Sequence, residues 1–456
     1  MFDIKTDIST EKGAIKIGYF KLENYSFISA ISINSSFLFF LSKYANIRII
    51  HVSNMKDICE TFKNINKHKL DYVYINSFNF LLASFLLREK LGLDIPFILK
   101  IHTVYPWIEE YVRIIPLLRK YDIIFAPSEY AKRSFLKISD KFKVYVIPNC
   151  VDLKSIRQSS TVASSKEKKR VVTLTFMGRI VPKKGLEIII ECMPKIVANI
   201  GNVCLNIIGP LSGEGLKDLP KSAYVKKIQG LVKRRRLNSK INFIGAQFGA
   251  DKYRILSTSD IFVNPTLAKE ETFGMVNIEA LACGIPVVTT RWAGGGEIIK
   301  NGSNGYLIDV CRDSRGKPFI DPEELASLIV NALKDRMLNK TLKEKAIISA
   351  KKYDYRKVIP ALISLLKRRG MEGKVKNRWD FFKNKKAIDF KDFFNRDFLF
   401  FLYLKECFKI ETYSSLYTRT ISNIIETDNQ NAHKGNGHGN KIMNRIRQDL
   451  FWFLAS

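Results

Sequence analysis

Residues 271–288 of this chain read ETFGMVNIEALACGIPVV, and this stretch indicates both the fold class and the function. The glycine at 274 opens a predicted helix over Val276–Ala282, whose first amide N–H groups have no partner within the helix. Glu271 stands in the loop before the helix, and Glu279 lies about one turn inside it. The N–H groups suit a phosphate, and the carboxylates suit sugar hydroxyl groups. Each glutamate also has an ordinary interpretation, as a helix-start acid at 271 and a surface ion pair at 279.

Short apolar segments alternate with helical periodicity on both sides of this stretch, which predicts parallel sheets covered by helices. The predicted strands of the first half are Ala14–Phe20, Ile47–Val52, Tyr72–Ile75, Phe97–Ile101, Ile123–Ala126 and Val144–Ile147. Those of the second half are Val171–Gly178, Val203–Gly209, Ile241–Gly245, Ile261–Pro265 and Pro286–Thr290. Further predicted helices are Phe78–Leu87, Gly185–Asn199, Ser222–Arg236 and Pro322–Leu333. The fold class is therefore α/β, with a ligand expected in a cleft between two similar halves.

Composition sets the predicted domain boundaries. Residues 1–153 form an N-terminal parallel-sheet domain, and 171–350 form a second one. The polar, serine-rich segment 154–170 is predicted to be a linker between them. A helix over 351–369 is expected to return toward the N-terminal domain. Residues 370–456, aromatic and basic and then polar, are expected to form a helical appendage with a flexible stretch.

The balance of charge is the unusual feature of the composition. There are 75 basic and 44 acidic residues, so the formal net charge is +31. This excess favours anionic partners, among them nucleotide phosphates, nucleic acid or an anionic membrane face, without choosing among them. The seven cysteines include no CxxC pair, which fits a reducing compartment. The first residues lack the order of a secretory signal, so we expect a cytoplasmic protein, with peripheral membrane contact as an option.

A second segment, 176–185, reads FMGRIVPKKG. It contains a strand that ends in Gly178, a loop that carries Arg179 and Lys184, and Gly185 at the start of a helix. Two cations beside helix N–H groups suit a diphosphate. Basic loops after strands are common, so this segment alone is a weak signal.

The order of these motifs along the chain is highly specific. Gly-Arg…Lys-Gly is followed by Asn-Pro-Thr, by Glu-x-Phe-Gly-x4-Glu-Ala-x-Ala-x-Gly-x-Pro-Val-Val, by Gly295-Gly-Glu and by Asn301-Gly-x-Asn-Gly. This pattern resembles the family-four retaining glycosyltransferases of the GT-B fold, clearly over 171–308 and more weakly at Ser128 and at 148–152. The resemblance implies two Rossmann-like domains that face each other across a cleft. It also implies transfer of a sugar from a nucleotide-sugar donor with retention of configuration.

The resemblance also implies roles for individual residues. Arg179 and Lys184 match the pair that grips the donor diphosphate and stabilises its charge as it leaves. Glu271 matches the glutamate near the hydroxyl groups of the transferred sugar, and Glu279 matches the one that holds the ribose. His102, after a predicted strand, matches a histidine near the anomeric centre, although a histidine at such a place is more often structural.

Six further positions complete the donor site that the resemblance implies: Gly178, Gly245, Phe273, Gly274, Met275 and Val276. The N–H groups at 274–276 would bind phosphate and sugar. One departure from the family concerns the loop after the first strand, Lys21–Ser29, which lacks the usual glycine pair and puts the acceptor position in doubt.

We expect no cofactor and no metal, because the sequence contains no Asp-x-Asp motif and fixed cations can stabilise the leaving diphosphate. The expected partners are the nucleotide sugar, a glycan or lipid-linked acceptor and an anionic membrane surface. A catalytically weak partner subunit is the main alternative, followed by a nucleic-acid-associated basic protein, which the net charge suggests. A sugar-nucleotide epimerase of the same fold is disfavoured by the Glu-Thr-Phe-Gly form of the motif. Nucleic-acid binding is unlikely because no such motif is recognisable. The sugar, the base, the acceptor and the oligomeric state stay open.

Overall fold

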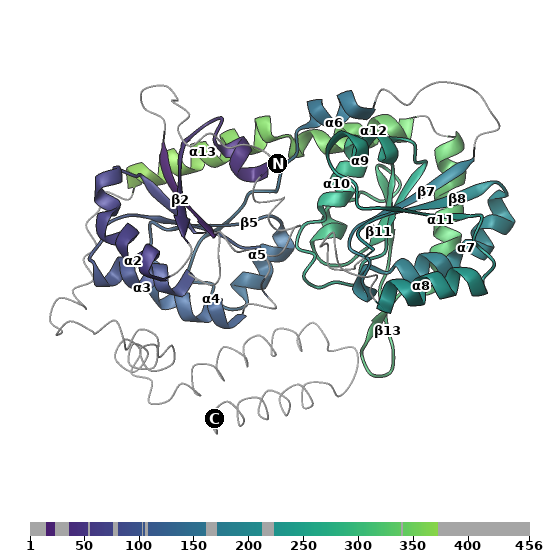
Figure 1. Ribbon diagram of the computed structural model, residues 1–456, viewed down its shortest axis with the longest axis horizontal. Helices are drawn as coiled ribbons and strands as arrows, with labels where there is room; N and C mark the ends of the chain where they lie inside the picture. Colours follow the sequence, from purple (N-terminus) through teal and green to yellow (C-terminus); the bar gives the residue numbers. More distant parts are fainter. Residues whose placement is uncertain are drawn as a thin grey trace.

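The computed structural model describes residues 15–22, 36–52, 55–75, 81–102, 104, 108–160, 171–211, 223–338 and 341–372. They form two α/β domains, drawn in purple to blue and in teal to green in Figure 1. The predicted fold class, two parallel-sheet domains, is confirmed.

The N-terminal domain is built on a six-stranded parallel sheet in the order β2-β1-β3-β4-β5-β6. Its strands are β1 (Lys16–Leu22), β2 (Asn46–Val52), β3 (Tyr72–Ile75), β4 (Phe97–Lys100), β5 (Ile123–Ala126) and β6 (Val144–Val146). The helices are α2 (Met55–Asn64), η1 (Ile65–His68), α3 (Leu81–Lys90), α4 (Ile108–Ile114), η4 (Ile115–Leu117) and α5 (Glu129–Leu136). Strands β3, β4 and β5 are buried at every residue, because helices cover both faces of a parallel sheet.

The second domain repeats this plan with the order β12-β11-β10-β7-β8-β9. Its strands are β7 (Val172–Met177), β8 (Val203–Ile208), β9 (Ile241–Gly245), β10 (Ile261–Asn264), β11 (Val287–Thr290) and β12 (Gly305–Ile308), and the pair β13 (Cys311–Arg312) and β14 (Pro318–Phe319) forms a small hairpin. The helices are η6 (Pro182–Lys184), α7 (Leu186–Ile200), α8 (Ala223–Arg234), α9 (Gly249–Ser257), α10 (Met275–Ala282), η7 (Gly294–Ile298), α11 (Pro322–Leu338) and α12 (Thr341–Ala350). Its main apolar core packs α7, α8 and α11 on the sheet.

The chain crosses between the domains twice, and the two crossings lie side by side. Val151 donates its N–H to the Tyr353 carbonyl at 3.0 Å and accepts from the Tyr355 N–H at 3.0 Å. After the short helix η8 (Lys351–Tyr353), helix α13 (Tyr355–Glu372) runs back over the N-terminal domain (Figure 1). There the Tyr355 ring stacks on Phe40 at 4.4 Å, and the Tyr72 hydroxyl donates to the Leu366 carbonyl at 2.6 Å.

The structure differs from the predicted linker over 154–170. Its first part is helix α6 (Leu153–Ser160), and residues 161–170 lie outside the described part of the chain. Asp152 caps the helix by accepting from the N–H groups of Lys154 at 3.1 Å and Ser155 at 3.3 Å. Leu153 and Ile156 are buried one turn apart, so two apolar residues dock a helix that is otherwise polar.

Several short elements were not predicted at all, among them β12, the β13–β14 hairpin, α5 and α9. Strand β1 begins two residues later than expected, at Lys16. The predicted tail over 370–456 lies outside the described residues beyond Glu372, as does the loop Lys21–Ser29 beyond Leu22.

Candidate active site

The loop after β7 brings its two cations to the edge of the second domain. Gly185, which links η6 to α7, has φ +74°, and a Cβ placed on it would stand 2.2 Å from the Pro265 carbonyl oxygen. Only glycine fits at that position. The Lys183 carbonyl accepts the Leu267 N–H at 2.9 Å, which fixes the loop against the segment after β10. Lys184 therefore meets the 268–274 loop.

Lys184 and Glu271 form an ion pair there, and Glu271 Oε1 also accepts the Gly274 N–H at 3.1 Å. Burial alone would raise the pKa of Glu271, but the Lys184 ammonium, the Gly274 N–H and the charge of Arg179 hold this pKa below its usual value. The structure thus joins three of the four residues expected to take part in catalysis. The lysine neutralises the glutamate in this arrangement.

Arg179 is half-buried, and its guanidinium makes no hydrogen bond or ion pair with the described residues. Nearby, α10 begins at Met275 after Gly274, which has φ +82° and offers no side-chain cap. The N–H groups of Met275 and Val276 find no acceptor within the described chain. An unpaired guanidinium and open helix N–H groups together favour an anion.

Glu279 is 9% exposed and lies on α10. Its Oε1 accepts the Lys252 ammonium at 2.6 Å and the Tyr253 hydroxyl at 3.3 Å, both from α9. Burial, and then the Glu279 charge, raise the pKa of Tyr253 well above its ordinary value, so the phenol stays a donor. The Glu279 carboxylate is thus paired with two side chains of α9.

A buried amide network holds the glycine segment 294–296 against α10. Asn264 donates to the Asn277 side-chain oxygen at 2.9 Å, and Asn277 donates to the Gly295 carbonyl at 3.2 Å. A Cβ on Gly294 would fall 1.8 Å from the Thr272 carbonyl oxygen. The backbone on both sides of Glu271 is therefore packed closely and fixed.

The N-terminal domain contacts this same loop through the start of α5, which lies at the domain boundary in Figure 1. The Ser128 hydroxyl accepts the Ala131 N–H as the helix cap and donates to the Thr272 carbonyl at 2.5 Å. Arg133 forms an ion pair with Glu297 Oε1 at 2.9 Å. The other carboxylate oxygen of Glu297 accepts the Glu129 N–H at 3.0 Å.

His102 follows β4 and reaches the same place through its backbone, because the Thr272 hydroxyl donates to its carbonyl oxygen. Burial, followed by the charge of Lys100, lowers the pKa of His102 to about 3, so its imidazole is neutral at physiological pH. Lys100 itself is only 2% exposed. Its ammonium lies 4.1 Å from the centre of the Phe37 ring and has no hydrogen-bond acceptor among the described residues.

The remaining predicted residues divide into two groups. Gly178 follows β7 and Gly245 ends β9, the two strands on either side of β8. The Gly245 carbonyl accepts the N–H of Gly209, which follows β8, at 3.0 Å. Phe273 is 4% exposed, and its ring packs edge-on against Tyr353 at 5.7 Å. The Phe273 side chain thus belongs to the core beneath the crossings, and only its backbone borders the site.

Sequence reasoning missed Thr272, Lys252 and Tyr253. Thr272 stands inside the quoted motif, but its contact with His102 depends on how the two domains meet. Lys252 and Tyr253 lie in α9, a polar helix with no motif to mark it.

Comparison with known structures gives the class. A glycosyltransferase from Rickettsia africae superposes with a TM-score of 0.63 at 17% identity, over 80% of this chain and 100% of that one. Anabaena HepE in complex with UDP and glucose gives a TM-score of 0.58 at 18% identity, over 78% and 100%. This protein has the two-domain GT-B fold of glycosyltransferases.

Comparison with known families and sequences goes one step further. Residues 158–352 match the model of glycosyl transferases group 1, and residues 35–155 match that of Glycosyltransferase Family 4. The chain therefore belongs to the family-four glycosyltransferases. Sucrose synthase isoform 2 of Daucus carota is 32% identical over 182 residues, which are 39% of this chain and 21% of the carrot protein. The chain spans less than half the length of the first curated relatives it matches.

Two further findings concern the described residues only. No helix among them has the length and apolar character needed to cross a membrane. They also contain no group of three or more His, Cys, Asp or Glu side chains arranged to hold a metal ion.

Proposed function

We propose that this protein transfers a sugar from a nucleoside diphosphate sugar to a glycan or lipid-linked acceptor, with retention of the anomeric configuration. The observation that carries the proposal is the grouping of an unpaired Arg179, the Lys184–Glu271 pair and the open first turn of α10. The binding of UDP and glucose by a GT-B neighbour supports a nucleotide-sugar donor.

The chemistry follows from charge. The bond between the anomeric carbon and the phosphate oxygen breaks, and its electron pair stays on the leaving diphosphate. An acceptor hydroxyl oxygen forms the new bond and gives up its proton to the diphosphate or to water. Arg179 and Lys184 then face a more negative group than in the bound donor, so they stabilise the transition state more than the ground state.

In this proposal Lys184 changes partner when the donor enters. Its ammonium passes from Glu271 to the diphosphate, and the Glu271 carboxylate becomes available to the sugar hydroxyl groups. Glu279 binds the ribose beside Lys252. The neutral His102 lies near the anomeric centre and accepts or donates a hydrogen bond there.

We also propose that the reaction needs no divalent metal, since the two cations can carry the charge of the diphosphate. The protein is proposed to work in the cytoplasm at an anionic membrane face, which its net charge of +31 would attract.

A donor screen tests the proposal. The protein is incubated with UDP-, GDP- and ADP-sugars in EDTA, and release of nucleoside diphosphate and the anomeric proton of the product are followed by NMR. We expect turnover of one donor class, with an unchanged anomeric configuration. If a nucleotide sugar binds but none of the donors releases its nucleoside diphosphate, the result would favour the partner-subunit alternative. An inverted anomeric configuration in the product would refute retention.

A further inference from the structure

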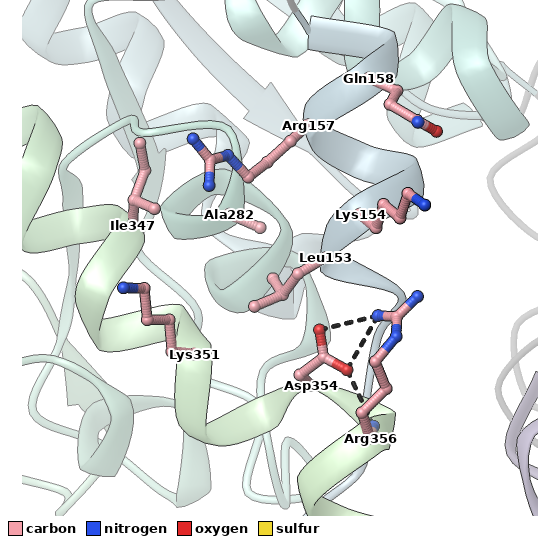
Figure 2. A pocket seen from close by; sticks show the side chains of 9 residues that line it. All are labelled: Leu153, Lys154, Arg157, Gln158, Ala282, Ile347, Lys351, Asp354 and Arg356. Carbon is pink, nitrogen blue, oxygen red and sulfur yellow. Dashed lines mark hydrogen bonds and ion pairs between the residues drawn. The ribbon is translucent and has the colours of Figure 1, made fainter.

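A cavity of about 550 Å³ lies where the two domain crossings meet. Helix α6, the end of α12 and the segment 351–356 line it (Figure 2). Ala282, the last residue of α10, forms part of its floor. Glu279, which is proposed to bind the ribose, lies about one turn before Ala282 on the same helix. None of the residues that line the cavity is assigned to the donor, so the cavity is a site with its own lining.

We call this cavity, where the two domain crossings meet, the hinge pocket. Its lining is strongly basic. Four of its residues are cations, Lys154, Arg157, Lys351 and Arg356, and one, Asp354, is an anion. Asp354 is already neutralised, because Arg356 pairs with it at 3.1 Å and with Asp152 at 3.0 Å. The pocket thus keeps an excess of positive charge.

The cations surround an apolar floor. Leu153, Ala282 and Ile347 form this floor. Figure 2 shows Arg157 and Lys351, from opposite walls, extending toward the space around Ile347, whereas Lys154 and Gln158 point away from it. A guanidinium and an ammonium on opposite sides suit a small dianion, and the floor suits a short carbon skeleton attached to it. The volume is within the range of small-molecule sites.

We propose that the hinge pocket binds a phosphomonoester, with Arg157 and Lys351 as its principal ligands. Arg157 belongs to the first crossing and Lys351 to the second, so the bound phosphate would join the two segments that connect the domains. Occupancy would therefore stabilise the arrangement of the domains seen here. This inference does not rest on the proposed sugar transfer.

Titration calorimetry on the full chain, with inorganic phosphate and with glycerol 3-phosphate, tests the pocket. The double variant Arg157→Gln/Lys351→Met should bind at least tenfold more weakly than the wild type. Lys345→Met is the matched control, because Lys345 is exposed on α12 and does not line the pocket, and it should bind like the wild type. Arg179→Ala should also keep the binding, which separates the pocket from the donor site.

A second arm distinguishes a free phosphate from a lipid headgroup. Flotation with phosphatidylcholine vesicles containing one-fifth phosphatidic acid is compared for the same variants. If only the vesicles bind, and the double variant loses that binding while Lys345→Met keeps it, the phosphomonoester is a lipid headgroup. The proposal is overturned if neither probe binds, or if the double variant and the control bind equally.

Discussion

Some ionisable side chains in this protein are buried away from water. Lys100 is the clearest case, since burial lowers the pKa of its amine to about 8, against a small opposing effect of Cys150. The folded state therefore releases this proton more readily than the unfolded chain, whose lysine has a pKa near 10.5. Below pH 8 the amine is charged in both states and its burial is fully unfavourable. The penalty decreases between pH 8 and 10.5 and vanishes above that range.

We expect Lys100→Met to raise the free energy of unfolding at pH 7 by up to about 3 kcal/mol, the equivalent of lowering the lysine pKa from 10.5 to about 8. The gain should fade between pH 8 and 10.5. Urea denaturation across this range measures both effects. Lys43→Met is the control, because Lys43 also lies over aromatic rings, at 4.7 and 4.8 Å, but is exposed. A stabilisation that does not depend on pH would contradict the account.

Gly185 is a second residue whose type the backbone dictates. We expect Gly185→Ala to lower the free energy of unfolding by about 2 kcal/mol or more, because the left-handed conformation costs roughly 1–2 kcal/mol and the Cβ also collides with the Pro265 carbonyl. Gly302→Ala supplies the control, with φ +71° but no atom within 4 Å of its Cβ. Thermal unfolding of both variants separates collision from backbone strain, and equal losses would show that the contact with Pro265 is unimportant.

Among the helices and strands, those formed by continuous apolar runs can be predicted from the sequence. Strands β3, β5 and β9 have the predicted ends, because each is a short run rich in apolar residues between polar segments, and β3 and β5 are buried at every residue. Helix α6 was not predicted, since only Leu153 and Ile156 dock an otherwise polar segment. Strand β12 was missed because it begins with Gly305, a residue type that weakens a strand pattern, although its pairing requires glycine there: a Cβ on Gly305 would lie 2.1 Å from the Val287 carbonyl oxygen.

In the candidate site, too, some residues could be predicted from the sequence and others could not. The residues that motifs mark, such as Arg179, Lys184 and Glu271, could be named from their order along the chain. The contact between Lys252 and Glu279 joins different helices. The contact between Thr272 and His102 spans 170 positions and both domains. No local pattern contains that information.

The contact between the 268–274 loop and β4 leads to a prediction about catalysis. We expect Thr272→Val to lower kcat about tenfold, because it removes the hydroxyl that ties the donor loop to the backbone of His102. Affinity for the nucleoside diphosphate that the wild type binds should change less than twofold, since the proposed donor contacts lie in the second domain. Steady-state kinetics and calorimetry measure the two quantities. Thr258→Val, whose hydroxyl donates only to the Ile255 carbonyl at 2.8 Å, should match the wild type. An equal loss of affinity and turnover would refute this separation.

For the whole molecule, the net charge of +31 is the property that acts over the longest distance, because it attracts anionic surfaces. We expect binding to vesicles of phosphatidylcholine and phosphatidylserine that weakens steeply between 50 and 500 mM salt, because a Debye length of about 8–10 Å at physiological salt screens surface charge. Cosedimentation measures it, with pure phosphatidylcholine as the control. Equal binding to both vesicle types, or none, would dismiss the membrane proposal.

If Arg179, Lys184 and the start of α10 hold a donor diphosphate, calorimetric titration with UDP, GDP and ADP will detect the binding of a nucleoside diphosphate at these residues. One of these nucleotides should bind the wild type, and Arg179→Ala should bind it roughly ten- to a hundredfold more weakly, the loss of charge-assisted hydrogen bonds worth about 1.5–3 kcal/mol. Lys183→Ala should bind like the wild type, because Lys183 is 43% exposed and pairs with Glu270 instead. Binding of no nucleoside diphosphate, or equal binding by all three proteins, would contradict the account.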